Sequence, residues 1–123
     1  MSGLTPDTPL PLEIRLLTAS RKLEIAFDNG ASFSLPAEYL RVYSPSAEVR
    51  GHGAGQEVLQ VGKHQVGITA LEPVGHYALK IVFDDGHDSG LYSWDYLYRL
   101  GADHDRNWQD YLDRLARAGA SRE

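Results

Sequence analysis

The segment Phe83–Leu97, FDDGHDSGLYSWDYL, is the stretch of the chain with the most side chains able to do chemistry. His87 stands beside acidic residues in a glycine-flanked turn, between a predicted strand and a predicted helix. Imidazole and carboxylate groups bind transition metals and act in acid–base catalysis. The segment therefore suggests a metal site or a catalytic base. The structural alternative is a polar residue that is hydrogen-bonded within a turn.

The metal hypothesis places zinc or iron on His87, with oxygen and nitrogen ligands from its neighbours. The candidate ligands are His87, Asp85, Asp88 and His52, with Asp84 and Glu48 as further donors. No recognised ligand spacing is present, so we favour the structural alternative, in which the imidazole bonds to a loop or caps the turn. The acidic neighbours also predict a raised histidine pKa, and a protonated imidazole binds metals poorly. We expect no resident cofactor.

Catalytic motifs are missing, and the sequence predicts that the protein is not an enzyme. The chain has no cysteine, which excludes thiol catalysis, disulfides and thiolate-held clusters. It has no Gly-x-Ser-x-Gly nucleophile turn and no His-x-Asp or His-x-Glu pair for a facial-triad iron site. The loop RGHGAG, residues 50–55, lacks the Gly-Lys-Ser/Thr ending of a phosphate loop. A small enzyme built on His87, Asp85 and Ser89 ranks last.

The size and charge of the chain narrow the class of protein further. Its 123 residues suffice for one domain with its own core. Twelve basic and 17 acidic residues give a net charge of −5, and the basic residues are dispersed along the sequence. This pattern argues against binding to duplex nucleic acid or an anionic membrane. The N-terminus lacks a signal-peptide pattern and no apolar run has membrane-spanning length, so we expect a cytoplasmic protein.

Hydrophobic periodicity predicts an α+β fold that is rich in β-structure, after an unstructured tail over residues 1–11. The expected sheet is mainly antiparallel, folded into one or two layers, and covered by short and C-terminal helices. Strands are predicted from residue 13, over 21–27 and 31–35, and again over 57–61, 64–72 and 76–83. The sequence Asp28–Gly30 predicts a hairpin turn.

Helices are expected in three places. Proline suits the first helical position, so residues 36–41 are predicted to form one short turn. Residues 42–57 are predicted to be a long loop. Ser93 is expected to cap a helix through Leu100, with Gly101 as its C′ residue. A last helix is predicted from an apolar stripe at Trp108, Tyr111, Leu112 and Leu115. We expect one domain over 12–101, and this helix with a tail over 102–123.

Two motifs and their spacing resemble a known family. They are LRVYSPSAEVRGHG at residues 40–53 and ITALEPVGHYALKIVFDDGHDSGLYSWDYLYRLG at residues 68–101. The chain is similar, over about residues 13–101, to the small N-terminal domain of γ-butyrobetaine hydroxylase. That domain also occurs as a free-standing bacterial protein of unknown function, and related copies are attached to ATPases that carry iron–sulfur clusters.

The resemblance implies a non-catalytic domain, which in the hydroxylase holds a structural zinc through three cysteines and one histidine. The cysteine positions correspond to Ser44, Ser46 and Val49 here, and the histidine position to His87. Three of the four ligands are therefore absent. Because neutral serine hydroxyls are poor zinc ligands, we do not expect the family's zinc site in this chain.

The leading hypothesis is a non-catalytic, cytoplasmic interaction module. The resemblance brings the loop Ser44–Gly55 and the turn His87–Trp94 together as one surface. The predicted contact residues are Ser44, Ser46, Arg50, His52, His87, Tyr92 and Trp94. By analogy with the relatives, the expected partner is an iron–sulfur carrier or an oxygenase, and not a nucleic acid or a membrane. The alternative is a metal-binding protein centred on His87. A homodimer is a further expectation, because the Trp108 helix can pack either on the sheet or across a dimer.

Overall fold

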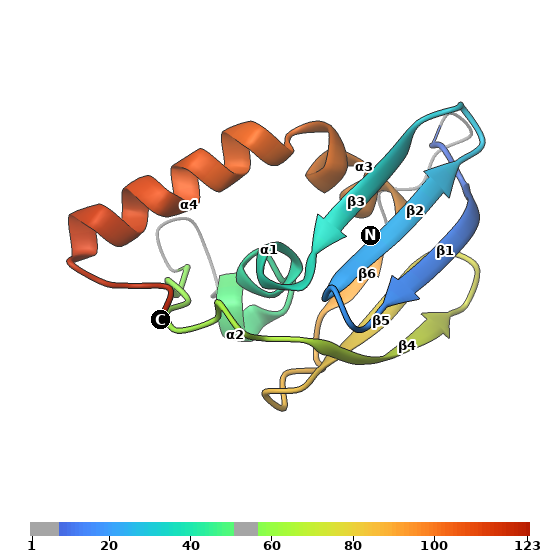
Figure 1. The fold of residues 1–123 in the computed structure, drawn as a ribbon. Helices are drawn as coiled ribbons and strands as arrows, with labels where there is room; N and C mark the ends of the chain where they lie inside the picture. Colours follow the sequence, from blue (N-terminus) through green and yellow to red (C-terminus); the bar gives the residue numbers. More distant parts are fainter. Residues whose placement is uncertain (1–7, 51–56) are drawn as a thin grey trace.

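The structure, a computed structural model, describes residues 8–50 and 57–123. These residues form two three-stranded antiparallel sheets with four helices, which confirms the predicted α+β class and the predominance of antiparallel strands (Figure 1). The strands are β1 (Pro11–Leu17), β2 (Lys22–Phe27), β3 (Ser32–Pro36), β4 (Ile68–Val74), β5 (Ala78–Phe83) and β6 (Leu91–Ser93). The helices are α1 (Ala37–Val42), α2 (Ala47–Arg50), α3 (Trp94–Ala102) and α4 (His104–Ala118).

The first sheet has the order β1-β2-β3. Alternate residues of β2 are buried, and its neighbours pair with it in antiparallel register. The predicted hairpin turn joins β2 to β3, with Gly30 at a φ of 90° that favours glycine. The unstructured tail predicted over residues 1–11 extends too far, because Pro11 begins β1 and the Leu10 N–H donates to Asp28 Oδ1. Residues 1–7 lie outside the described part.

The second sheet has the order β4-β5-β6 and differs from the prediction at three points. The strand predicted over residues 64–72 is shifted, because β4 runs from Ile68 to Val74. Residues 57–61 form no strand, since their alternating pattern meets no partner and Val58 and Val61 stay about half exposed. The short strand β6 was not predicted, because its three residues run directly into α3. Pro73 lies within β4, where an edge position tolerates a residue without an N–H group.

The helices depart from the prediction at two points. The segment predicted to be a loop throughout contains the four-residue helix α2. Gly101 is not the C′ residue of α3, because that helix continues to Ala102. A Cβ atom at Gly101 would clash with the ring of Phe33, so this glycine permits close packing of α3 against β3. The predicted N-cap is confirmed, since Ser93 Oγ accepts the Tyr96 N–H at 3.1 Å.

The core lies where the sheets, α1 and α3 meet, and α4 closes it from the other side (Figure 1). Tyr111 and Leu115 from the predicted stripe of α4 are buried, while Trp108 and Leu112 are half buried against the same core. Three buried tyrosines satisfy their hydroxyl groups by donating to backbone carbonyls: Tyr39 to Leu100, Tyr92 to Leu40 and Tyr111 to Gln60. Among the helices in the described ranges, none is both long and apolar enough to cross a bilayer.

Candidate functional site

The loop that carries α2 and the turn after β5 meet at a group of polar side chains. We call this group the loop–turn junction; it consists of Ser44, Ser46, Glu48, His87 and Ser89. Ser44 Oγ lies 2.8 Å from His87 Nε2, and His87 Nδ1 lies 3.6 Å from Glu48 Oε1. Ser44 and His87 are both buried. The structure therefore brings together the two segments that the resemblance placed side by side.

A second link runs parallel to the first. Ser46 Oγ and Ser89 Oγ lie 2.6 Å apart, and Ser89 Oγ donates to Glu48 Oε2 at 2.8 Å. Since the Ser89 proton is used by Glu48, the hydroxyl of Ser46 is the donor in the serine–serine bond. Ser44 Oγ and Ser46 Oγ also accept the N–H groups of Ser46 and Glu48, so each hydroxyl fixes the start of α2 as well. The serine hydroxyl groups of the junction are therefore satisfied by hydrogen bonds within it.

Asp85 anchors the same turn through charged contacts. Its Oδ2 atom lies 2.8 Å from Arg41 Nε and 2.7 Å from Lys63 Nζ, and its Oδ1 atom accepts the His87 N–H at 3.1 Å. Burial alone would raise the pKa of this carboxyl, but the hydrogen bonds from Lys63, the His87 N–H and Arg41 outweigh it and lower the pKa to about 2. Asp85 is therefore a structural ion-pair partner near neutral pH.

The pKa of His87 is lowered, which corrects the prediction that its acidic neighbours raise it. The largest cause is burial, which disfavours the charged imidazole, and the positive charge of Arg41 adds to it. The negative charges of Glu48 and Asp85 act in the opposite direction without reversing the shift. His87 is consequently a neutral hydrogen-bonding group at neutral pH, able to accept the hydroxyl proton of Ser44.

The predicted metal ligands do not converge in the described parts of the chain. The Asp85 carboxylate pairs with the side chains of Arg41 and Lys63. Asp88 Oδ2 lies 3.9 Å from Lys80 Nζ at the surface. Residues 8–50 and 57–123 contain no group of three His, Asp or Glu side chains that could hold a metal ion. His52 lies outside the described residues.

The zinc that the resemblance implies does not fit the side chains at its position. Two of the four positions are hydroxyl groups engaged in hydrogen bonds, and a third is the buried apolar side chain of Val49. Only His87 keeps a donor that zinc prefers, and its Nε2 atom already faces Ser44. We therefore derive no chemistry through zinc at this position.

A nucleophile–base–acid order is present in the junction, although with different residues from those predicted. Ser44, His87 and Glu48 lie in the order that hydrolases use, although the 3.6 Å between His87 Nδ1 and Glu48 Oε1 is too long for a hydrogen bond. Ser89 donates to Glu48, and Asp85 pairs with Arg41 and Lys63. Ser44 is fully buried, and Gly90 packs so closely that a Cβ atom there would clash with Ser44 Oγ. In this conformation the hydroxyl has no access to a substrate carbonyl.

The predicted contact residues are mostly interior, which corrects their assignment to a surface. Exposure is 8% or less for five of the seven: Ser44, Ser46, His87, Tyr92 and Trp94. Tyr92 donates to the Leu40 carbonyl, and Trp94 Nε1 donates to the His76 carbonyl at 2.9 Å. Arg50 is exposed, and His52 lies outside the described residues. The sequence could not separate core tyrosine from surface tyrosine in this aromatic cluster.

A hollow of about 210 Å³ beside the junction was missed by the sequence analysis. We call it the arginine hollow; it is lined by Tyr43, Arg50, Tyr96, Arg99, Leu100, Asp103, Arg106 and Asn107. Its three arginines come from α2, α3 and α4, and Arg50 is far in sequence from Arg99 and Arg106. The sequence signal was therefore present only as dispersed basic residues, and the fold makes them one patch.

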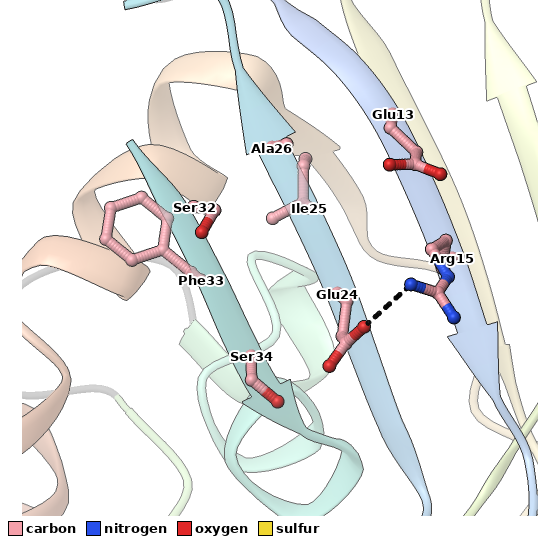
Figure 2. Close-up of a pocket in the computed structure, with 8 residues that line it drawn as sticks. All are labelled: Glu13, Arg15, Glu24, Ile25, Ala26, Ser32, Phe33 and Ser34. Atoms are coloured by element: carbon pink, nitrogen blue, oxygen red, sulfur yellow. Dashed lines mark ion pairs between the residues drawn. The ribbon is translucent and has the colours of Figure 1, made fainter. Parts of the chain in front are cut away.

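A larger hollow of about 400 Å³ lies on the outer face of the first sheet (Figure 2). Figure 2 shows Arg15 on β1 and Glu24 on β2 facing one another, and their closest charged atoms are 3.6 Å apart. Small side chains at Ala26, Ser32 and Ser34 leave the space. Both charged residues are well exposed, so their ion pair is weak and the hollow is a concave face of a twisted sheet.

Comparison with known proteins agrees with this fold and with the resemblance. Residues 14–98 match the family described as γ-butyrobetaine hydroxylase-like, N-terminal, and the chain belongs to that family. No curated protein matches the chain. The match confirms the predicted family and nearly the predicted range.

Solved structures extend the comparison. Two protein structures determined in solution by NMR are 54% and 56% identical to this chain, each with a TM-score of 0.82. They cover 94% and 98% of this chain, and 91% and 92% of their own lengths. A crystal structure of a protein of unknown function from Acidithiobacillus ferrooxidans, in the DUF971 family, is 39% identical with a TM-score of 0.65. It covers 80% of this chain and 99% of its own length.

Proposed function

We propose that this protein is a non-catalytic accessory module that works in the cytoplasm by binding another protein. The observation that carries the proposal is the closed loop–turn junction. The histidine with the most catalytic and metal-binding promise is buried and hydrogen-bonded to Ser44, and the carboxylate nearest to its backbone is held by Arg41 and Lys63. The groups that could do chemistry are thus used to fix the backbone of two loops.

A rigid, hydrogen-bonded pair of loops suits a recognition surface, because pre-organised loops lose little conformational entropy on binding. Glu48 and Ser89, at the outer rim of the junction, reach the surface. The family supports the same direction, since its name refers to an N-terminal domain that accompanies a hydroxylase. The hydroxylase in the family name suggests an oxygenase as partner, and the resemblance to domains attached to iron–sulfur ATPases suggests an iron–sulfur carrier.

The experiment that tests the proposal is partner capture followed by reconstitution. The chain with a small affinity tag is purified from its native host under mild conditions, and co-purifying proteins are identified by mass spectrometry. Each candidate is then produced alone, mixed with the pure chain, and examined by size-exclusion chromatography with light scattering. A defined complex of two pure proteins supports the proposal. Failure of every candidate to bind the pure chain contradicts it.

A homodimer is distinguished in the same experiment, because light scattering of the pure chain gives its mass without a partner. A mass of two chains that persists on dilution assigns the interaction to a second copy. Substrate turnover by the pure chain that is lost in His87→Ala but retained in Asp88→Ala would contradict the non-catalytic part of the proposal.

A further inference from the structure

The arginine hollow gathers positive charge on a protein whose net charge is −5. Arg50 ends α2, Arg99 lies in the last turn of α3, and Arg106 lies in the first turn of α4. One carboxylate, Asp103, lines the same hollow. Asp95 lies outside the lining but pairs with Arg99, so the three guanidinium groups face two carboxylates and one positive charge, that of Arg50, is left over among the described residues.

Within the described part of the chain, the arginines of the hollow form only exposed, weak ion pairs. Arg99 Nε lies 3.2 Å from Asp95 Oδ2 and Arg106 Nη2 lies 2.9 Å from Asp103 Oδ2, and both arginine side chains are more than 60% exposed. Such exposed pairs contribute little to stability and exchange readily with an incoming anion. Arg50 has no ion-pair partner among residues 8–50 and 57–123.

The wall of the hollow is held together by hydrogen bonds between side chains and backbone. The Tyr96 hydroxyl donates to the Tyr43 carbonyl at 2.6 Å, and the Tyr43 hydroxyl donates to the Asn107 carbonyl at 2.7 Å. The guanidinium carbon of Arg99 lies 5.8 Å from the centre of the Tyr96 ring. Burial raises the pKa of Tyr96, and the charges of Arg50 and Arg99 oppose this rise, as expected for guanidinium groups close to the ring.

We infer that the arginine hollow binds an acidic peptide segment of a partner protein, with at least two carboxylates placed among Arg50, Arg99 and Arg106. This inference rests on the proposed interaction function and names the chemistry of the partner. Guanidinium groups bind carboxylates through paired N–H donors, which gives direction as well as attraction. The hollow, at about 210 Å³, is smaller than the roughly 300 Å³ at which small-molecule sites usually begin.

The charge of the rest of the molecule selects against long polyanions. Duplex nucleic acid requires a basic surface that follows many phosphates, whereas the positive patch here spans one hollow on an acidic chain. A short acidic segment places its charge within the patch and avoids the negative surroundings. Binding of this kind weakens as salt increases, because exposed charges are screened.

The test is a titration of the full chain with a hexaglutamate peptide at low salt. Binding is monitored through the NMR signals of the backbone amides and the arginine side chains. We expect saturable shifts at Arg50, Arg99, Arg106 and Asn107 that vanish in high salt. The double variant Arg50→Ala/Arg99→Ala is expected to bind roughly tenfold more weakly, because two exposed ion pairs are lost. The control Arg117→Ala removes an exposed arginine of α4 outside the hollow, and we expect its affinity to change less than about twofold.

Three further probes serve as comparisons. Hexaglutamine is a neutral peptide of the same length, and inorganic phosphate and a short single-stranded oligothymidylate are other anions. The inference is supported if only hexaglutamate gives saturable binding that depends on Arg50 and Arg99. Binding of phosphate or the oligonucleotide at the same residues with equal or higher affinity would overturn it, as would hexaglutamate binding that is unchanged in the double variant. The arginines are exposed, so the variants are expected to fold, and an unchanged amide spectrum elsewhere verifies this.

Failure of this inference and failure of the proposed function have different signatures. If hexaglutamate does not bind but a captured partner forms a complex, the interaction function stands and its surface lies elsewhere. If the double variant still binds that partner with the affinity of the unmodified chain, the inference is likewise overturned. If hexaglutamate binds but no protein forms a complex with the pure chain, the hollow stands and the interaction function is contradicted.

Discussion

The loop–turn junction and the arginine hollow are neighbours that use polar side chains in opposite ways. In the junction, Ser44 and His87 are neutral, buried and bonded to each other. In the hollow, Arg50 and Arg106 are charged, exposed, and either unpaired in the described residues or paired only at the surface. Buried polar groups must be satisfied within the fold, whereas exposed charges keep water or a partner as an alternative. Residues whose side chains are reactive can therefore have a structural role, while binding falls to other residues.

The largest expected change in the free energy of unfolding is at the junction, and its absence would contradict this comparison. His87→Ala leaves Ser44 Oγ without its imidazole partner and creates a cavity, so we expect a loss of about 3 kcal/mol in the free energy of unfolding. Asp88→Ala, at the exposed neighbouring position, is expected to change it by less than about 0.5 kcal/mol. Urea denaturation followed by circular dichroism measures both. Equal losses in the two variants would show that His87 is not a structural residue.

Acid should weaken the junction before it affects the hollow. The pKa of Asp85 is lowered to about 2 from 3.8, so its contribution is complete above pH 3.8 and is lost as the pH falls towards 2. The pKa of His87 is lowered from 6.5, so its contribution is present above pH 6.5 and is lost as the pH falls below that value. Both pKa values are lower in the folded chain, so the unfolded chain binds more protons and acid favours unfolding.

We expect the free energy of unfolding to fall between pH 7 and pH 2, with about 1 kcal/mol from Asp85 because solvent screens this partly exposed carboxylate. Denaturation at a series of pH values measures the fall. In Asp85→Asn the part below pH 4 should shrink, while the part near pH 6 should remain. A pH profile that is identical in this variant would contradict the assignment of Asp85.

The serine link in the junction is a smaller contributor. Ser46→Ala removes the bond to Ser89 and the acceptor for the Glu48 N–H, and we expect a loss of about 1–2 kcal/mol. The matched control is Ser34→Ala on the exposed face of β3, which should change stability by less than about 0.5 kcal/mol. Thermal unfolding of the two variants distinguishes them, and a greater loss in the control would contradict the importance of the link.

The smallest effect on stability is expected in the hollow. Arg50→Ala removes an exposed side chain without an ion-pair partner in the described ranges, so the free energy of unfolding should change by less than about 0.5 kcal/mol. Urea denaturation checks this value beside the binding measurement for the same position. A loss near that of His87→Ala would make Arg50 a structural residue and remove the contrast between the two regions.

Periodicity and turn chemistry were enough to predict the first sheet, the Asp28–Gly30 hairpin, the Ser93 cap and the stripe of α4, because these features depend on residues close in sequence. The strand predicted over residues 57–61 is absent, since alternation alone does not supply a pairing partner. Gly101 was misread because its role is set by Phe33, which is distant in sequence.

The candidate site shows the same limit. The resemblance was enough to bring Ser44 and His87 together, but not to tell that their side chains face inwards. The pKa of His87 could not be inferred from its acidic neighbours in the sequence, because burial is the larger cause of its shift. The arginine hollow forms from three helices, and only the folded chain brings its residues together.

The most direct test of the central claim is ¹⁵N NMR of the His87 imidazole at pH 7, recorded before and after addition of one equivalent of zinc. If His87 is a neutral, hydrogen-bonded structural residue, its ring nitrogens show the chemical shifts of a neutral imidazole, and the Ser44 hydroxyl proton bonded to Nε2 exchanges slowly. Zinc is expected to leave these signals unchanged. A charged ring at this pH, or stoichiometric zinc-dependent shifts centred on His87, would contradict the account.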